Sequence, residues 1–134
     1  MMTPSGLALR SGVALRVLLV DDNEDSCDLF ELALGAEGHH VDCCYDGVTG
    51  LERLVTGGYD VAVIDIGLPG LDGFDLARRA RAALGERTPR LVAMTGYSRE
   101  SDREASRAAG FEVHLVKPVH VPTLIQAVVA SGSG

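Results

Sequence analysis

Hydrophobic residues occur along this chain in five short runs that are separated by longer amphipathic stretches. The runs, mostly rich in valine, isoleucine and leucine, lie at residues 17–20, 41–45, 61–64, 91–94 and 113–116. Most of them do not alternate between apolar and polar positions, so they predict parallel β-strands whose two faces are both covered. The pattern therefore predicts a buried sheet between two outer layers.

The stretches between the runs have the spacing of amphipathic helices. Apolar side chains recur three and four positions apart, most clearly in Cys27–Leu34 and Val121–Val128. Gly38 is suited to end the first helix, and Asp46 is suited to cap the second. Five strands alternating with five helices predict an α/β fold with a doubly wound parallel sheet. Such a sheet binds its ligands beyond the carboxyl ends of its strands.

The length of 134 residues predicts one domain that is large enough to bury its own core. We expect this domain to span residues 14–130. Both ends of the chain are rich in small and polar residues, so we expect flexible tails at residues 1–13 and 131–134.

The charge balance excludes several classes of function. Twelve basic residues against nineteen acidic ones give a net charge of −7, and Lys117 is the only lysine. An acidic chain without a basic run binds phosphate backbones poorly, so we expect no direct binding of nucleic acid. No uninterrupted apolar run exceeds four residues, so we expect no membrane span.

The cysteine and histidine pairs suggest no chemistry of their own. The three cysteines, Cys27, Cys43 and Cys44, are odd in number and do not resemble a secreted disulfide framework. We therefore expect a structural role for them and a cytoplasmic, reducing location. For His39 and His40 we expect a solvated loop rather than a metal site.

Carboxylates follow two of the predicted strands. Asp21 and Asp22 come directly after the first strand, and Asp65 follows the third. Singly, each has an ordinary explanation, because acids stabilise helix starts and aspartate favours turns. If the two strands are neighbours, however, the three carboxylates converge and repel one another unless a cation neutralises them. Carboxylate oxygens suit Mg²⁺, so with this fold we favour a metal site.

Three further residues at strand ends suit a phosphoryl group. Lys117 offers a compact positive charge, Thr95 a hydroxyl donor, and Gly96 an accessible backbone N–H. A surface lysine and a strand-ending threonine are the alternative explanations of the first two. Together with the acids, these groups suit phosphoryl transfer, with Asp65 as the simplest nucleophile. The nucleotide-binding pattern Gly-x-x-x-x-Gly-Lys-Ser/Thr is absent, so we do not expect a nucleotide as the donor.

Four stretches at strand ends, taken together and in this order, resemble the receiver domains of two-component response regulators. They read VLLVDDN at 17–23, DIGLPGLDGF at 65–74, MTGY at 94–97 and LVKPV at 115–119. The resemblance covers about residues 14–130. It implies a flavodoxin-like receiver fold with five strands in the order 2-1-3-4-5.

The resemblance also implies roles for individual residues. Asp65 would be phosphorylated by a histidine kinase or a histidine phosphotransfer protein. Asp22 and Asp65 would bind Mg²⁺ directly, together with the backbone carbonyl of Gly67, and Asp21 would act through water. Lys117 would pair with Asp65 or with its phosphate. The protein would thus be a phosphoacceptor that assists its own phosphorylation, and we do not expect it to turn over a diffusible substrate.

The family's switch depends on an aromatic residue that this chain lacks. In the family, Thr95 is coupled to that residue on the last strand, where His114 stands here. His114 is therefore either a switch residue or an ordinary half-exposed strand residue. Tyr97 is either a shield of the phosphoryl group or a surface turn residue. We expect phosphorylation to alter the partner-binding face formed by the fourth helix, fifth strand and fifth helix. The resemblance further implies a cis bond between Lys117 and Pro118.

Three alternatives to a single-domain receiver remain open. We expect no output domain after Ala130, but the chain is also similar to the terminal receiver of a hybrid histidine kinase. A Mg²⁺-dependent phosphatase with an aspartate nucleophile is the second alternative. Such enzymes usually place an acid two residues after the nucleophile, where this chain has Gly67. A purely structural interaction module is the third, and the intact acidic cluster with Lys117 argues against it.

Overall fold

The computed structural model describes residues 14–96 and 100–132. Its elements are β1 (Arg16–Val20), α1 (Glu24–Ala36), β2 (His40–Cys44), α2 (Gly47–Gly57), β3 (Val61–Asp65), α3 (Gly73–Leu84), the 3-10 helix η3 (Gly85–Arg87), β4 (Arg90–Thr95), α4 (Glu100–Ala109), β5 (Val113–Val116) and α5 (Val121–Gly132). The expected tails at residues 1–13 and 133–134 lie outside the described residues. Helix α5 continues to Gly132, so residues 131 and 132 are helical rather than part of a tail.

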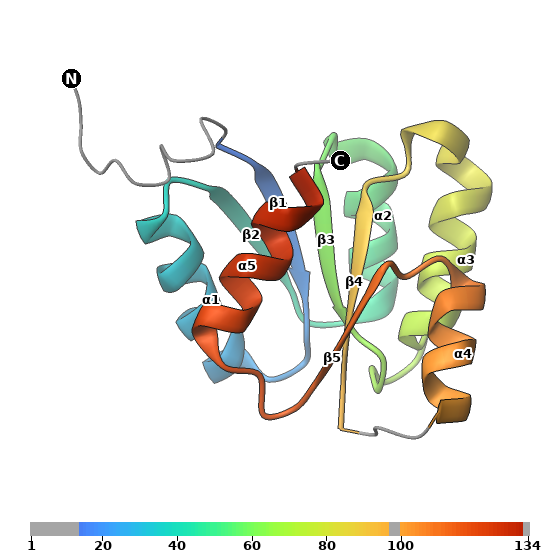
Figure 1. Cartoon of the computed structure of the whole chain (residues 1–134). Coiled ribbons are helices and arrows are strands. Elements are labelled where there is room, and N and C mark those ends of the chain that lie inside the picture. The colour runs from blue at the N-terminus through green and yellow to red at the C-terminus, as the bar shows by residue number, and fades with distance from the viewer. Residues whose placement is uncertain (1–13, 97–99, 133–134) are drawn as a thin grey trace.

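The five strands form one parallel sheet in the order β2-β1-β3-β4-β5 (Figure 1). This order confirms the predicted doubly wound architecture. Strands β1 and β3 are neighbours, and Val20 pairs with Ile64 near their carboxyl ends. The carboxyl ends of these two strands are therefore held side by side, and this places Asp21, which follows β1, next to Asp65, which ends β3.

Helices cover both faces of the sheet. Helices α1 and α5 lie on one face, and α2, α3 and α4 lie on the other (Figure 1). Alternate residues of the central strands enter the two cores: Leu18 and Ile64 pack on the side of α2 and α3, whereas Leu19 and Val63 pack on the side of α1 and α5. Because both sets are fully buried, the strands read as continuous apolar runs.

Short polar side chains fix the starts of three helices. Asn23, Asp46 and Asp72 cap α1, α2 and α3, each accepting a hydrogen bond from a backbone N–H three residues on. The predicted cap at Asp46 is thereby confirmed. Helix α1 ends two residues before Gly38, whose φ of 96° turns the chain toward β2. Within the described part of the chain, no helix has both the length and the hydrophobicity needed to cross a membrane.

Candidate functional site

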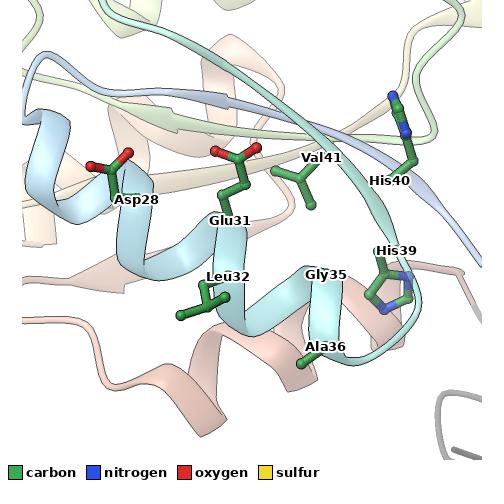
Figure 2. Close-up of a pocket in the computed structure, with 8 residues that line it drawn as sticks. All are labelled: Asp28, Glu31, Leu32, Gly35, Ala36, His39, His40 and Val41. Atoms are coloured by element: carbon green, nitrogen blue, oxygen red, sulfur yellow. The ribbon is translucent and has the colours of Figure 1, made fainter.

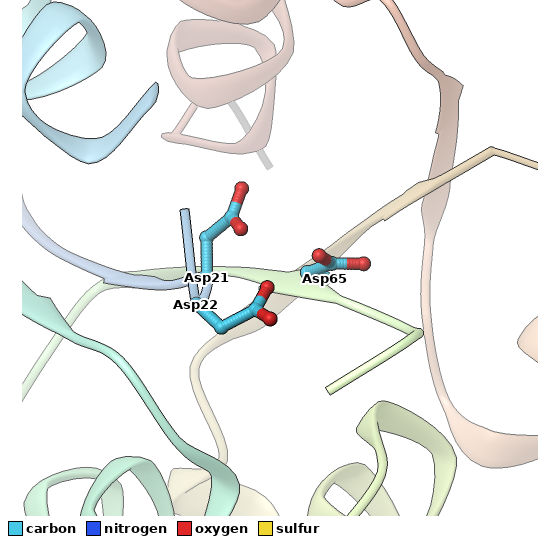
Figure 3. Close-up of side chains that lie close together, drawn as sticks. All are labelled: Asp21, Asp22 and Asp65. Atoms are coloured by element: carbon cyan, nitrogen blue, oxygen red, sulfur yellow. The ribbon is translucent and has the colours of Figure 1, made fainter. Parts of the chain in front are cut away.

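The fold gathers three carboxylates at the carboxyl edge of the sheet. Asp21 and Asp22 leave β1, and Asp65 ends β3; an oxygen from each lies within 4.8 Å of the others (Figure 3). Asp21 and Asp65 are buried, whereas Asp22 is exposed. Backbone hydrogen bonds from Asp21 to Cys44 (3.0 Å) and from Ile66 to Met94 (2.9 Å) extend the pairing beyond the strands. The cluster therefore stands on rigid backbone and opens outward at Asp22.

Each buried carboxylate has one oxygen held by the backbone and one that faces Lys117. The N–H of Asn23 donates to Asp21 Oδ1, and the N–H of Gly67 donates to Asp65 Oδ1, both at 2.9 Å. The Lys117 ammonium lies 2.9 Å from Asp65 Oδ2 and 3.5 Å from Asp21 Oδ2. Lys117 comes from the end of β5, 52 residues after Asp65, so only the sheet brings these charges together.

The charges of the site are only partly balanced. Burial raises the pKa of Asp21, and the charge of Asp65 adds to this, while the Asn23 N–H and Lys117 act in the opposite direction. Burial by itself would lower the pKa of Lys117, but its hydrogen bond to Asp65 and the two carboxylate charges raise it overall. Among the residues that the structure describes, three carboxylates face one ammonium, so this part of the site has an excess of negative charge.

This excess fits a divalent cation. Hard carboxylate oxygens that converge beside solvent are the ligands that Mg²⁺ prefers, and the buried Asp21 is destabilised without a neutralising partner. The side chains of Asp21, Asp22 and Asp65 are the groups that can hold such an ion. The predicted ligand role of the Gly67 carbonyl stays a prediction.

The ends of β4 and β5 form the other side of the site. Thr95 is buried, and its carbonyl accepts a hydrogen bond of 2.7 Å from the N–H of Lys117. The bond between Lys117 and Pro118 is cis. Gly96 is exposed, and open space surrounds the position that a Cβ would occupy. An anion beside Asp65 can therefore approach the backbone there. Tyr97 lies outside the described residues.

His114 lies on β5 opposite Ala93 and is half-buried. Both nitrogens of its ring are buried and have no hydrogen-bond partner in the part of the chain that the structure describes. The surroundings of the ring thus offer its two nitrogens no hydrogen bond among the described residues. Its role as a switch residue stays a prediction.

The expected solvated loop at His39 and His40 is wrong. His39 is buried, and its Nδ1 accepts a hydrogen bond of 3.1 Å from the N–H of Leu15. His40 begins β2, is exposed, and has its Nε2 3.6 Å from Asp42. The two rings line a hollow of about 610 Å³ between α1 and β2 but point away from each other (Figure 2).

Sequence reasoning missed Asn23 as part of the site. Its side chain caps α1 by accepting from the N–H of Ser26 (3.0 Å), while its own N–H fixes the carboxylate of Asp21. The signal was present in the sequence, because asparagine before Glu24 and Asp25 is a typical helix start. The second contact depends on the turn that links β1 to α1, which the pattern does not specify.

Comparison with known proteins identifies the family. The model of the response regulator receiver domain matches residues 17–129. An uncharacterised 14.6 kDa protein of Leptolyngbya boryana is 36% identical over 84% of this chain and 86% of its own length. Response regulator ArlR of Staphylococcus saprophyticus is 31% identical over 82% of this chain, which spans only about half (49%) of that relative.

A solved structure supports the same relationship. The receiver domain of sensor histidine kinase PA1611 from Pseudomonas aeruginosa, solved with a magnesium ion coordinated in its active-site cleft, is 29% identical. It superposes with a TM-score of 0.77 over 88% of this chain and 99% of that one. The sheet order, the carboxylate cluster and the match over residues 17–129 thus agree, and the chain belongs to the response regulator receiver domains of two-component signalling.

Proposed function

We propose that this chain is a phosphoacceptor and that Asp65 receives a phosphoryl group from a phosphohistidine. The donor is a histidine kinase or a histidine phosphotransfer protein. The observation that carries the proposal is the contact of 2.9 Å between Lys117 Nζ and Asp65 Oδ2 inside the carboxylate cluster. A carboxylate oxygen of Asp65 attacks phosphorus, the bond between phosphorus and the imidazole nitrogen breaks, and an acyl phosphate forms on Asp65.

Neighbouring groups orient and stabilise the phosphoryl oxygens. The ammonium of Lys117 offers positive charge from the end of β5, and the hydroxyl of Thr95 and the N–H of Gly96 offer donors from the end of β4. The backbones of Lys117 and Thr95 are joined before any phosphoryl group arrives, because the N–H of Lys117 donates to the carbonyl of Thr95.

The residues that would hold Mg²⁺ are Asp21, Asp22 and Asp65, together with the carbonyl of Gly67. When bound, the ion neutralises the charge that develops on the phosphoryl oxygens. The excess negative charge of the site supports this assignment, as does the magnesium ion in the related PA1611 receiver domain.

The output surface is the face formed by α4, β5 and α5. We propose that phosphorylation draws the hydroxyl of Thr95 toward the phosphoryl group and that His114 responds on β5, so that a downstream protein binds differently. Both ring nitrogens of His114 are buried without a hydrogen-bond partner among the described residues. A movement that gave them partners would be favourable, and this supports the proposed response of His114. The three free cysteines support a reducing, cytoplasmic setting for this signalling.

One alternative context is favoured by a specific observation. The similarity to the receiver domain of a sensor histidine kinase supports a terminal receiver in a hybrid kinase. The chemistry at Asp65 is the same in both contexts, and they differ in whether the donor is part of the same polypeptide. Phosphatase turnover is the weaker idea, because Gly67 stands where a general acid is needed.

Incubation with Mg²⁺ and acetyl phosphate, followed by intact-mass measurement, tests the proposal. We expect one added phosphoryl group that requires Mg²⁺ and disappears in Asp65→Asn. Asp75→Asn, which alters an exposed aspartate on α3, is the matched control and should be phosphorylated like the parent. Because some receivers react poorly with small donors, a phosphorylated histidine phosphotransfer protein is the second donor. Modification at another residue, or none with either donor, overturns the proposal.

A further inference from the structure

Two of the three cysteines lie close together between α1 and β2. Cys27 is buried on α1, and Cys43 is half-buried on β2, on the face that α1 covers. The Cys43 thiol donates to the backbone carbonyl oxygen of Cys27 at 3.8 Å, and the nearby Cys27 side chain raises the pKa of Cys43. Cys44 packs into the core on the opposite side of the sheet. The adjacent residues Cys43 and Cys44 thus lie on opposite faces of the sheet, and the nearest cysteine to Cys43 on its own face is Cys27.

The Cys27 side chain also contacts the backbone of the phosphoacceptor site. Its thiol lies 3.4 Å from the carbonyl oxygen of Asp21, to which it donates. Asp21 is the first of the two carboxylates that leave β1. A change at the Cys27 sulfur is therefore one hydrogen bond away from the backbone that positions Asp21 and Asp22.

We propose that Cys27 and Cys43 are a redox-active pair that closes to an intramolecular disulfide and thereby links oxidation to the phosphoacceptor site. The bond joins helix α1 to strand β2 across a contact that already exists in the reduced protein. The oxidant is a low-molecular-weight disulfide of the glutathione class.

The chemistry balances as two thiol–disulfide exchanges. The Cys43 thiolate attacks one sulfur of the oxidant, a first small thiol leaves, and a mixed disulfide forms on Cys43. The Cys27 thiolate then attacks the Cys43 sulfur, and a second small thiol leaves. Two electrons and two protons pass from the protein thiols to the oxidant. Cys43 reacts first because it is the more exposed of the two.

The surroundings make the pair slow to oxidise. The contact with Cys27, burial and the carboxylate of Glu31, whose Oε1 lies 3.7 Å from the Cys43 sulfur, all raise the pKa of Cys43. Because the thiolate is the attacking species, the reaction should accelerate as pH rises. The pair thus stays reduced in a reducing compartment and responds to sustained oxidation.

Closure has a consequence for Asp65 that rests on the proposed function. In the disulfide, the Cys27 sulfur has no proton, so the carbonyl of Asp21 loses its donor. The start of α1 and the turn that bears Asp21 and Asp22 must adjust. We expect the oxidised protein to accept phosphate from acetyl phosphate several-fold more slowly than the reduced protein.

The test uses the full chain, oxidised with glutathione disulfide at pH 7 and pH 9 under denaturant-free conditions. Intact mass should fall by two hydrogen atoms, faster at pH 9, and peptide mapping should find Cys27 joined to Cys43. Cys44→Ser is the matched control and should oxidise like the parent. Cys43→Ala and Cys27→Ala should each fail to lose the two hydrogens. Their circular dichroism spectra verify folding.

Each result decides the proposal. A bridge that involves Cys44, a bridge between two chains, or stable mixed glutathione adducts without closure overturns the pair. A Cys27–Cys43 bridge with an unchanged rate of Asp65 phosphorylation overturns the link to the site. If the reduced protein accepts no phosphate at all, the proposed function fails, while the mass and mapping results on the pair still stand.

Discussion

The two ends of the sheet bury polar side chains in opposite ways. At the carboxyl end, Asp21 lies beside Asp22 and Asp65, and a single ammonium only partly balances them. At the amino end, His39 is buried as a lone ring whose Nδ1 accepts the N–H of Leu15. The first arrangement leaves charge for a ligand to neutralise, whereas the second joins the starts of β1 and β2 through Nδ1 and leaves the buried Nε2 without a hydrogen-bond partner among the described residues. The difference separates a site built for function from one built for stability.

The two ends should also respond to pH with opposite signs. The raised pKa of Asp21 means that the folded protein binds this proton more tightly than the unfolded chain. The ionised carboxylate of Asp21 therefore destabilises the folded protein. This destabilisation is relieved as pH falls from the raised pKa toward the ordinary value of 3.8. Burial lowers the pKa of His39, so the folded protein binds that proton more weakly. Stability from His39 is therefore present above 6.5 and lost as pH falls below it.

The largest effect is expected from Lys117→Met. Loss of the ammonium leaves Asp65 and Asp21 without their shared partner, and we expect the free energy of unfolding in urea to fall by about 2 kcal/mol. Phosphorylation of Asp65 by acetyl phosphate should fall below detection. Lys117→Arg, which keeps the positive charge but not the compact ammonium, should restore most of the stability and not the phosphorylation. Full phosphorylation of the arginine variant would show that charge alone suffices.

A smaller effect of opposite sign is expected from Asp21→Asn. Without Mg²⁺, this variant removes a destabilised carboxylate, so its melting temperature should exceed that of the parent at pH 7. Mg²⁺ at about a hundred times its dissociation constant should stabilise the parent by roughly 2.7 kcal/mol and the variant much less. Equal stabilisation of both proteins by Mg²⁺ would place the ion elsewhere.

The smallest effect is expected at the amino end of the sheet. Between pH 7.5 and pH 5.5, the parent should lose stability through protonation of His39, because the charged ring can no longer accept the N–H of Leu15. His39→Gln should lose less over the same interval, although it is less stable at pH 7.5. His40→Gln is the matched control, since His40 is exposed, and it should follow the parent. Urea unfolding at pH 7.5 and at pH 5.5 measures how much stability the parent and each variant lose over this interval.

Much of the site could be predicted from the sequence, because strand ends are easy to locate in this fold. Asp21, Asp65 and Lys117 each follow an apolar run, and parallel strands deliver such residues to one edge of the sheet. Asn23 and His39 were harder. Their contacts depend on how a turn is shaped and on which backbone N–H lies nearby, and apolar periodicity carries no information about either.

The apolar pattern of the chain specifies the five strands, the five helices and the residues that share the carboxyl edge of the sheet, because burial of the strands on both faces requires continuous apolar runs. The packing of these elements in the folded protein determines which polar groups meet. It placed Lys117 Nζ between two carboxylates, set Cys43 against Cys27 rather than Cys44, and buried His39. Side-chain neighbours across elements are fixed by strand register and helix packing, which bring together residues that lie far apart in the chain and that no local pattern relates.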